Sequence, residues 1–107
     1  MTAIKFFLKE RILKGFEISG HTGYAHEGED IVCAAVSSAS QMAVNTITDV
    51  LHEEALVDCS DGYLKCVVLE PGKEVLDILE GLKIHLTQIS DQYPGYVKIY
   101  YGGIQNA

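Results

Sequence analysis

The chain of 107 residues contains no tryptophan, only two prolines and no excess of positive charge. Its formal net charge of −7 argues against a nucleic-acid-binding protein, because such proteins need a cationic surface to displace counterions. Its three cysteines form neither a CxxC pair nor the Cys/His spacing of a structural zinc site. No apolar run approaches the roughly 20 residues that span a bilayer, and the N-terminal segment lacks a signal-peptide core. These absences predict a cytoplasmic protein that binds neither nucleic acid nor membrane directly.

What is present is enough for one folded domain over residues 1–107. Hydrophobic residues make up 48% of the sequence, the share of an ordinary globular protein. Alternating apolar residues predict strands at 2–8 and 12–18, joined as a hairpin. Asp61-Gly62 lies between two apolar runs and predicts a second hairpin over 55–69, and a last strand is expected at 96–101.

Two segments have apolar residues at helical spacing, 30–52 and 73–91. We therefore expect an α+β fold of order ββαββαβ, with two helices packed on a mixed, largely antiparallel five-stranded sheet. One stripe of the first helix is predicted to face the sheet: Val32, Ala35, Val36, Ala39, Ala43, Thr46, Ile47 and Val50. A neighbouring stripe carries Cys33, Ser37, Ser40 and Val44, which places Cys33 beside the core face.

The stretch from Gly20 to Ser37, GHTGYAHEGEDIVCAAVS, combines a loop with the start of a helix. Its glycines Gly20, Gly23 and Gly28 predict a mobile loop, and Asp30 is placed to cap the helix. Cys33 would then lie in the first turn, where unpaired amides and the helix dipole favour the thiolate, the nucleophilic form. The amides of that turn, at Val32, Cys33 and Ala34, could serve as an oxyanion hole.

His21 precedes Cys33 by twelve residues and could hold the thiolate as an ion pair, then protonate a leaving amine. Asp30 could orient His21 or act only as a helix cap. A cysteine near a helix–sheet contact is also often simple packing, and a loop histidine such as His21 or His26 is often solvated. Cys59 and Cys66 fit strand patterns and are interpreted as core or sheet-face residues.

A zinc site built from His21, His26, Cys33 and an acidic residue is a rival interpretation. It lacks the close paired ligand spacing usual for zinc, so we expect no metal and no cofactor.

The same stretch closely resembles the signature of the ribosomal-processing cysteine proteases, the Prp family. Gly20-His21 matches the family's Gly-His near the end of the second strand. Residues 28–37, GEDIVCAAVS, match the family's Gly-x-Asp-x-Val-Cys-Ala-Ala followed by a serine. One departure is Thr22, where the family more often has alanine.

This resemblance implies a cysteine endopeptidase that removes an N-terminal extension from large-ribosomal-subunit protein twenty-seven. His21 would be the general base, Cys33 the nucleophile and Asp30 a supporting residue, with Gly20, Thr22, Gly23 and Gly28 in the substrate loop. It also implies a homodimer, and the acidic charge fits a basic ribosomal protein as partner. The alternative is a non-enzymatic, ribosome-associated binding module that holds a basic protein with the same loop and acidic face.

Overall fold

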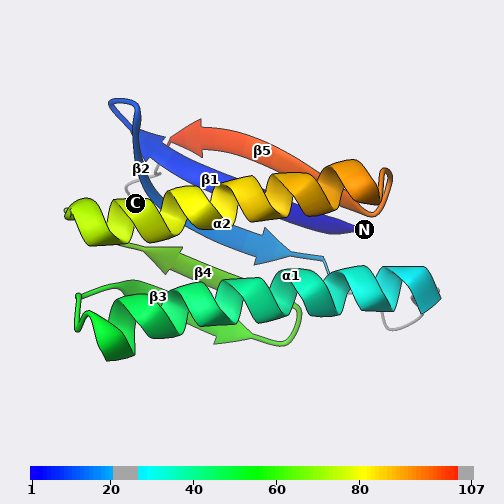
Figure 1. Ribbon diagram of the computed structural model, residues 1–107, viewed down its shortest axis with the longest axis horizontal. Coiled ribbons are helices and arrows are strands. Elements are labelled where there is room, and N and C mark those ends of the chain that lie inside the picture. Colours follow the sequence, from blue (N-terminus) through cyan, green and yellow to red (C-terminus); the bar gives the residue numbers. More distant parts are fainter. Residues whose placement is uncertain (21–26, 104–107) are drawn as a thin grey trace.

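The protein folds as a five-stranded sheet with two long helices across one face (Figure 1). The structure, a computed structural model, describes residues 1–20 and 27–103, with the backbone alone for residues 27–30. The elements in chain order are β1 (Thr2–Lys9), β2 (Ile12–Ser19), α1 (Glu27–Asn45), a π-helical turn η1 (Thr46–Val50), β3 (Leu56–Ser60), β4 (Tyr63–Val67), α2 (Lys73–Gln92) and β5 (Val97–Gly103).

The strand order is β3-β4-β2-β1-β5. β1 pairs in parallel with β5, and the other neighbouring strands pair antiparallel. The expected α+β fold with a mixed, largely antiparallel sheet is therefore confirmed. Because β1 pairs with β5, the first and last described strands lie side by side, with β5 at one edge of the sheet (Figure 1).

Both predicted hairpins are present. In the first, Glu10 and Arg11 have positive φ angles of 53° and 69°, the geometry of a turn whose twist suits a hairpin. Neither residue is glycine or asparagine, so the pairing of β1 with β2 imposes a backbone conformation that these residues rarely adopt. In the second hairpin Gly62 has a φ of 71°, which explains the Asp-Gly signal in the sequence.

The first helix differs from its prediction in where it starts and in what it buries. α1 begins at Glu27, so Asp30 is the fourth residue of the helix and not the cap before it. The buried stripe includes Ser40 and Val44, whereas Ala35 and Val50, expected in the core, are exposed.

The core lies between the sheet and the two helices. It is built from the alternate residues of the strands that point toward the helices, including Ile4, Phe6, Phe16 and Cys66, all fully buried. α2 contributes a complete stripe of buried residues: Val75, Leu79, Leu82, Leu86 and Ile89. Each such side chain stabilises the fold by about 1.5–3 kcal/mol relative to an exposed one.

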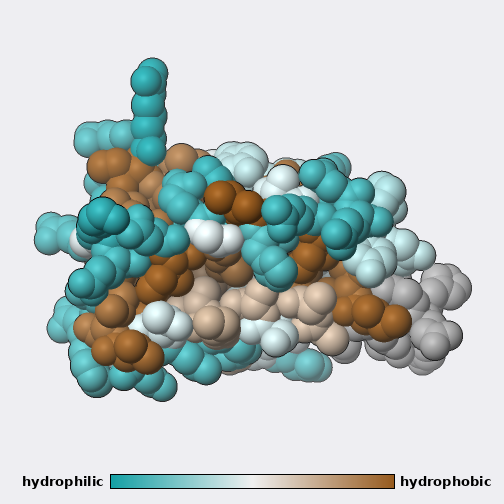
Figure 2. All heavy atoms as spheres, viewed as in Figure 1, coloured by the Kyte–Doolittle hydropathy of each residue, from teal (hydrophilic) through white to brown (hydrophobic). Residues whose placement is uncertain are grey.

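The helical stretch Ile31–Val50 has the length and hydropathy of a membrane span, contrary to the expectation that no such run exists. The same composition is typical of a core helix of a globular domain, and Val32, Val36 and Ile47 are buried in the core. Figure 2 shows apolar side chains along the seam between α1 and α2 and at the end of the molecule where η1 lies.

The sheet face away from the helices carries one buried aromatic residue, Phe7. Lys5 and Lys65 place their ammonium groups 5.5 Å and 5.4 Å from the centre of its ring. Its partners on the neighbouring strands are both glycines, Gly15 on β2 and Gly102 on β5. A Cβ atom on Gly15 would lie 2.0 Å from the carbonyl oxygen of Cys66, so β2 and β4 can approach as they do only with glycine there.

Candidate active site

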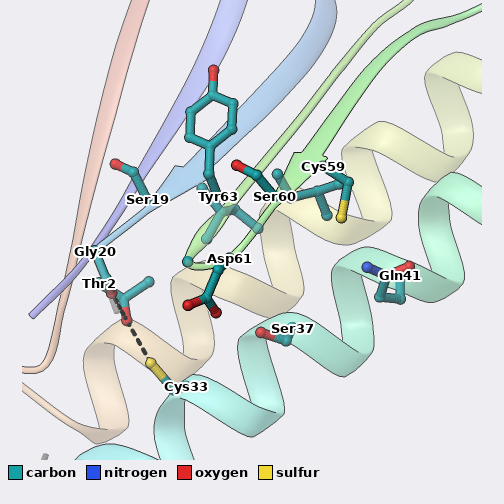
Figure 3. A pocket seen from close by; sticks show the side chains of 13 residues that line it. Thr2, Ser19, Gly20, Cys33, Ser37, Gln41, Cys59, Ser60, Asp61 and Tyr63 are labelled. Carbon is teal, nitrogen blue, oxygen red and sulfur yellow. Dashed lines mark hydrogen bonds between the residues drawn. The ribbon is translucent and has the colours of Figure 1, made fainter. Parts of the chain in front are cut away.

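A pocket of about 240 Å³ lies between the N-terminal half of α1 and the end of the sheet where β2 stops and β3 turns into β4 (Figure 3). It is open to solvent on one side. Its lining is Thr2, Ile18, Ser19, Gly20, Cys33, Ser37, Gln41, Cys59, Ser60, Asp61, Gly62, Tyr63 and Leu64.

Cys33 lies in this pocket with its side chain half-buried. Its Sγ atom is 3.1 Å from the hydroxyl oxygen of Thr2, which is itself almost fully buried at the start of β1. The backbone N–H of Thr2 donates a hydrogen bond of 2.9 Å to the carbonyl oxygen of Tyr96. The residue that touches the thiol is therefore held in place by the chain just before β5.

The Thr2 hydroxyl also lies 3.4 Å from the carbonyl oxygen of Gly20. A hydroxyl has one proton, so Thr2 can donate either to this carbonyl or to Cys33, but not to both. With a neutral thiol, Thr2 can donate to Gly20 and accept from the S–H group. With a thiolate, the same hydroxyl can turn and donate to the sulfur, which makes it a partner for both forms of Cys33.

Two opposed walls extend the pocket away from the thiol. Cys33, Ser37 and Gln41 are spaced four residues apart, so they lie on one side of α1 on successive turns. The other wall is the end of the β3–β4 hairpin, with Cys59 and Asp61 directed toward α1 (Figure 3).

Tyr63, at the start of β4, anchors the hairpin to the neighbouring strand. Its ring points away from α1, and its hydroxyl donates a hydrogen bond of 2.5 Å to Glu17 Oε2. This hydrogen bond to a carboxylate raises the pKa of Tyr63 to about 12, with further contributions from burial and from the negative charge of Glu17. Tyr63 therefore stays protonated at neutral pH and fixes the base of the β3–β4 turn.

Several residues predicted for the site lie outside what the structure describes. His21, Thr22 and Gly23 are among residues 21–26, and Gly28 and Asp30 are described by their backbone alone, in the first turn of α1. The described residues bring Cys33 together with Gly20, the residue immediately before His21.

The predicted oxyanion hole needs correction. Because α1 begins at Glu27, residues 32–34 fall in its second turn. Only the first four amides of an α-helix are left without a partner in the helix, and later amides donate to the carbonyl four residues earlier. The amides of Val32, Cys33 and Ala34 are thus not the free first-turn donors that the sequence suggested.

The remaining cysteines occupy different environments. Cys66 is fully buried, as expected of a core residue, and burial raises the pKa of its thiol to about 11. Cys59 is exposed and faces the pocket, a position that its strand pattern did not reveal. Across residues 1–20 and 31–103, no cluster of three or more His, Cys, Asp and Glu side chains is suited to a metal ion.

Thr2 and Asp61 were not predicted as parts of the site. Thr2 was visible only as the first residue of a strand, and Asp61 only as half of a turn signal. Both reach the pocket through contacts between segments that are distant in sequence, Thr2 with Cys33 and the β3–β4 hairpin with β2, which no local pattern encodes.

Comparison with known proteins identifies the family. The family described as cysteine protease Prp matches residues 1–98. The ribosomal processing cysteine protease Prp of Bacillus subtilis is 28% identical over 91 residues, which cover 78% of this chain and 81% of that protein.

Two solved structures share the fold. The essential ribosomal processing protease Prp of S. aureus, in complex with a substrate peptide, superposes with a TM-score of 0.87 at 21% identity, covering 94% of this chain and 99% of that one. SMU.848 of Streptococcus mutans superposes with a TM-score of 0.81 at 27% identity, covering 97% and 96% of the two chains. With its fold, its pocket and a match over residues 1–98, the chain belongs to the Prp family of cysteine proteases.

Proposed function

We propose that this enzyme is an endopeptidase that removes the N-terminal extension of large-subunit ribosomal protein twenty-seven, with Cys33 as nucleophile and His21 as general base. The observation that carries the assignment is the position of Cys33, a half-buried thiol that lines the pocket. The named relatives of B. subtilis and S. aureus are ribosomal processing proteases, which supports the substrate class.

The described residues support the pairing of His21 with Cys33. Thr2 contacts both the carbonyl of Gly20 and the sulfur of Cys33. Gly20 lines the same pocket, and His21 follows it directly in the sequence. Asp30 precedes Cys33 by three residues on α1, a spacing that places both on one side of the helix. We assign Asp30 a supporting role beside this pair.

We propose that the reaction begins when His21 takes the proton of the Cys33 thiol. The thiolate of Cys33 attacks the carbonyl carbon of the scissile bond, forming a C–S bond. The C–N bond then breaks, and His21 gives its proton to the departing amine. Water, deprotonated by His21, hydrolyses the thioester and releases the acid product together with the free thiol. No cofactor is needed at any step.

The assignment is tested by incubating the enzyme with the extended ribosomal protein and weighing the products by mass spectrometry. Wild type should release one N-terminal fragment, and Cys33→Ser and His21→Ala should release none. Cys59→Ser is the matched control, because it makes the same chemical change in the same pocket and should still cleave. Cleavage by Cys33→Ser would refute the nucleophile, and a wild type that binds the substrate intact would favour a binding module.

We further infer that the enzyme acts in the cytoplasm as a homodimer, as the resemblance to the family implies. Light scattering should give twice the mass of one chain. A monomeric mass at working concentration would contradict this assembly without touching the assignment of Cys33.

A further inference from the structure

We propose that Asp61 is a specificity-determining residue that selects a lysine or arginine side chain in the substrate, within about four residues of the scissile bond. This inference rests on the proposed function, because it requires a peptide to cross the pocket that holds Cys33. Asp61 lies in the turn between β3 and β4, on the wall that faces α1.

The first argument is charge. Asp61 is the one side chain charged at neutral pH among the described residues that line the pocket. The remaining lining is hydroxyl, thiol, amide, glycine or apolar in character. A single negative charge in a neutral pocket sets the sign of the charged side chain that can enter, since a second negative charge is repelled there.

The second argument is that the carboxylate of Asp61 has no partner in the described part of the chain. It forms no hydrogen bond and no ion pair with residues 1–20 or 31–103. Glu17, by contrast, accepts a hydrogen bond from Tyr63, and Asp77 pairs with Lys73. A carboxylate left in this state binds a guanidinium or ammonium group without first breaking an internal contact.

The third argument is direction. Figure 3 shows the Asp61 carboxylate pointing from the turn toward α1, on the side where Ser37 lies, and Cys33 lines the same pocket. A peptide whose scissile bond is at Cys33 and which continues along α1 must pass between Ser37 and Asp61.

The length of this wall sets the range. From Cys33 to Gln41 the helix rises by about 12 Å, at 1.5 Å per residue. An extended peptide advances about 3.3 Å per residue, so the wall accommodates roughly four substrate residues. Asp61 faces the middle of this wall, on the side of Ser37. The lysine or arginine that Asp61 selects therefore belongs to the substrate residues along this wall, on one side of the scissile bond.

The test uses peptides that span the cleavage segment of the ribosomal protein, with every lysine and arginine replaced by norleucine. A single lysine is then restored at each position in turn, and kcat/KM is measured against the norleucine parent. For wild type we expect a gain of about fivefold at one or two neighbouring positions, the size of a partly exposed ion pair. In Asp61→Asn this lysine-to-norleucine ratio should fall to about one, and in Asp61→Lys a glutamate at that position should be preferred.

Asp58→Asn is the matched control. Asp58 belongs to the same hairpin, and its replacement by asparagine removes the same charge. Asp58 does not line the pocket, and it is paired in register with Lys65 on the opposite face of the sheet. The lysine gain should survive in this variant. A gain that persists in Asp61→Asn, or that disappears equally in Asp58→Asn, would overturn the proposal.

Failure of the proposed function can be told apart from failure of this inference. If wild type cleaves none of the peptides, their dissociation constants for Cys33→Ala, measured by fluorescence anisotropy, give the same lysine-to-norleucine ratio without catalysis. A ratio above one that is lost when Asp61→Asn is added supports the inference. In this binding assay, a ratio of one at every position refutes the inference. In the cleavage assay, an equal loss of activity by Asp61→Asn on the lysine and norleucine peptides refutes it too.

Discussion

Replacing Thr2 by valine should slow the alkylation of Cys33 about fivefold at neutral pH. Valine keeps the shape of the side chain and removes the hydroxyl that lies 3.1 Å from the sulfur. A hydrogen bond to a charged group contributes about 1.5–3 kcal/mol, and one between neutral groups about 0.5–1.5 kcal/mol. The thiolate therefore loses about 1 kcal/mol more than the thiol does. Because only the thiolate reacts, a difference of this size lowers the rate by a factor of about five.

The assay follows iodoacetamide labelling by mass spectrometry, with peptide mapping to separate the three cysteines. Cys59 is exposed and, within the described part of the chain, forms no hydrogen bond with Thr2, so its rate serves as an internal standard in every variant. Thr2→Ser keeps the hydroxyl and should label at nearly the wild-type rate. If Thr2→Val labels Cys33 as fast as wild type while its melting temperature is unchanged, the Thr2 hydroxyl does not stabilise the thiolate.

Three further predictions concern stability. Gly15→Ala should lower the free energy of unfolding by about 3 kcal/mol in chemical denaturation, because the new Cβ would meet backbone atoms of β4; a loss under 1 kcal/mol would show that the strands can separate easily. Leu79→Ala should lower the free energy of unfolding by about 2–5 kcal/mol, because Leu79 is fully buried. Ile84→Ala, at an exposed position of the same helix, should lower it by less than about 0.5 kcal/mol. Equal losses in the two variants would contradict the described core. Burial raises the pKa of the Cys66 thiol from 9.0 to about 11. The contribution of Cys66 to the free energy of unfolding is therefore complete below pH 9, and about 2–3 kcal/mol of it is lost as the pH rises toward 11. The stability advantage of wild type over Cys66→Ala should stay constant below pH 9 and shrink between pH 9 and about 11.

The order and type of the elements could be predicted because each one has a buried side and an exposed side. Phe6 and Phe16 alternate with polar residues along their strands, and Leu79 and Leu86 recur at helical spacing, since the helices cover only one face of the sheet. Local periodicity records that arrangement directly. The start of α1 was missed because the capping rule selects Asp30, the last acidic residue before the apolar run, whereas the helix begins three residues earlier, at Glu27.

The pocket could not be predicted from local patterns. Val57 and Cys59 alternate along β3 as core residues would, yet both are exposed. β3 is an edge strand of the sheet, and the pocket is the gap between the end of the β3–β4 hairpin and α1. The width of such a gap depends on how far a helix sits from an edge strand, which is a property of the packed molecule.

The parallel pairing of β1 with β5 also has a consequence for when activity first arises. Thr2, which contacts the thiol of Cys33, is hydrogen-bonded to Tyr96, and β1 is paired along its length with residues 97–103. Contacts between segments so distant in sequence require the intervening chain to close into a loop, which costs conformational entropy. During synthesis, residues up to 103 must leave the ribosome before this side of the pocket is complete. A partly synthesised chain therefore exposes Cys33 without its neighbour Thr2 fixed beside it, and the protease matures only after its own translation has passed the last strand.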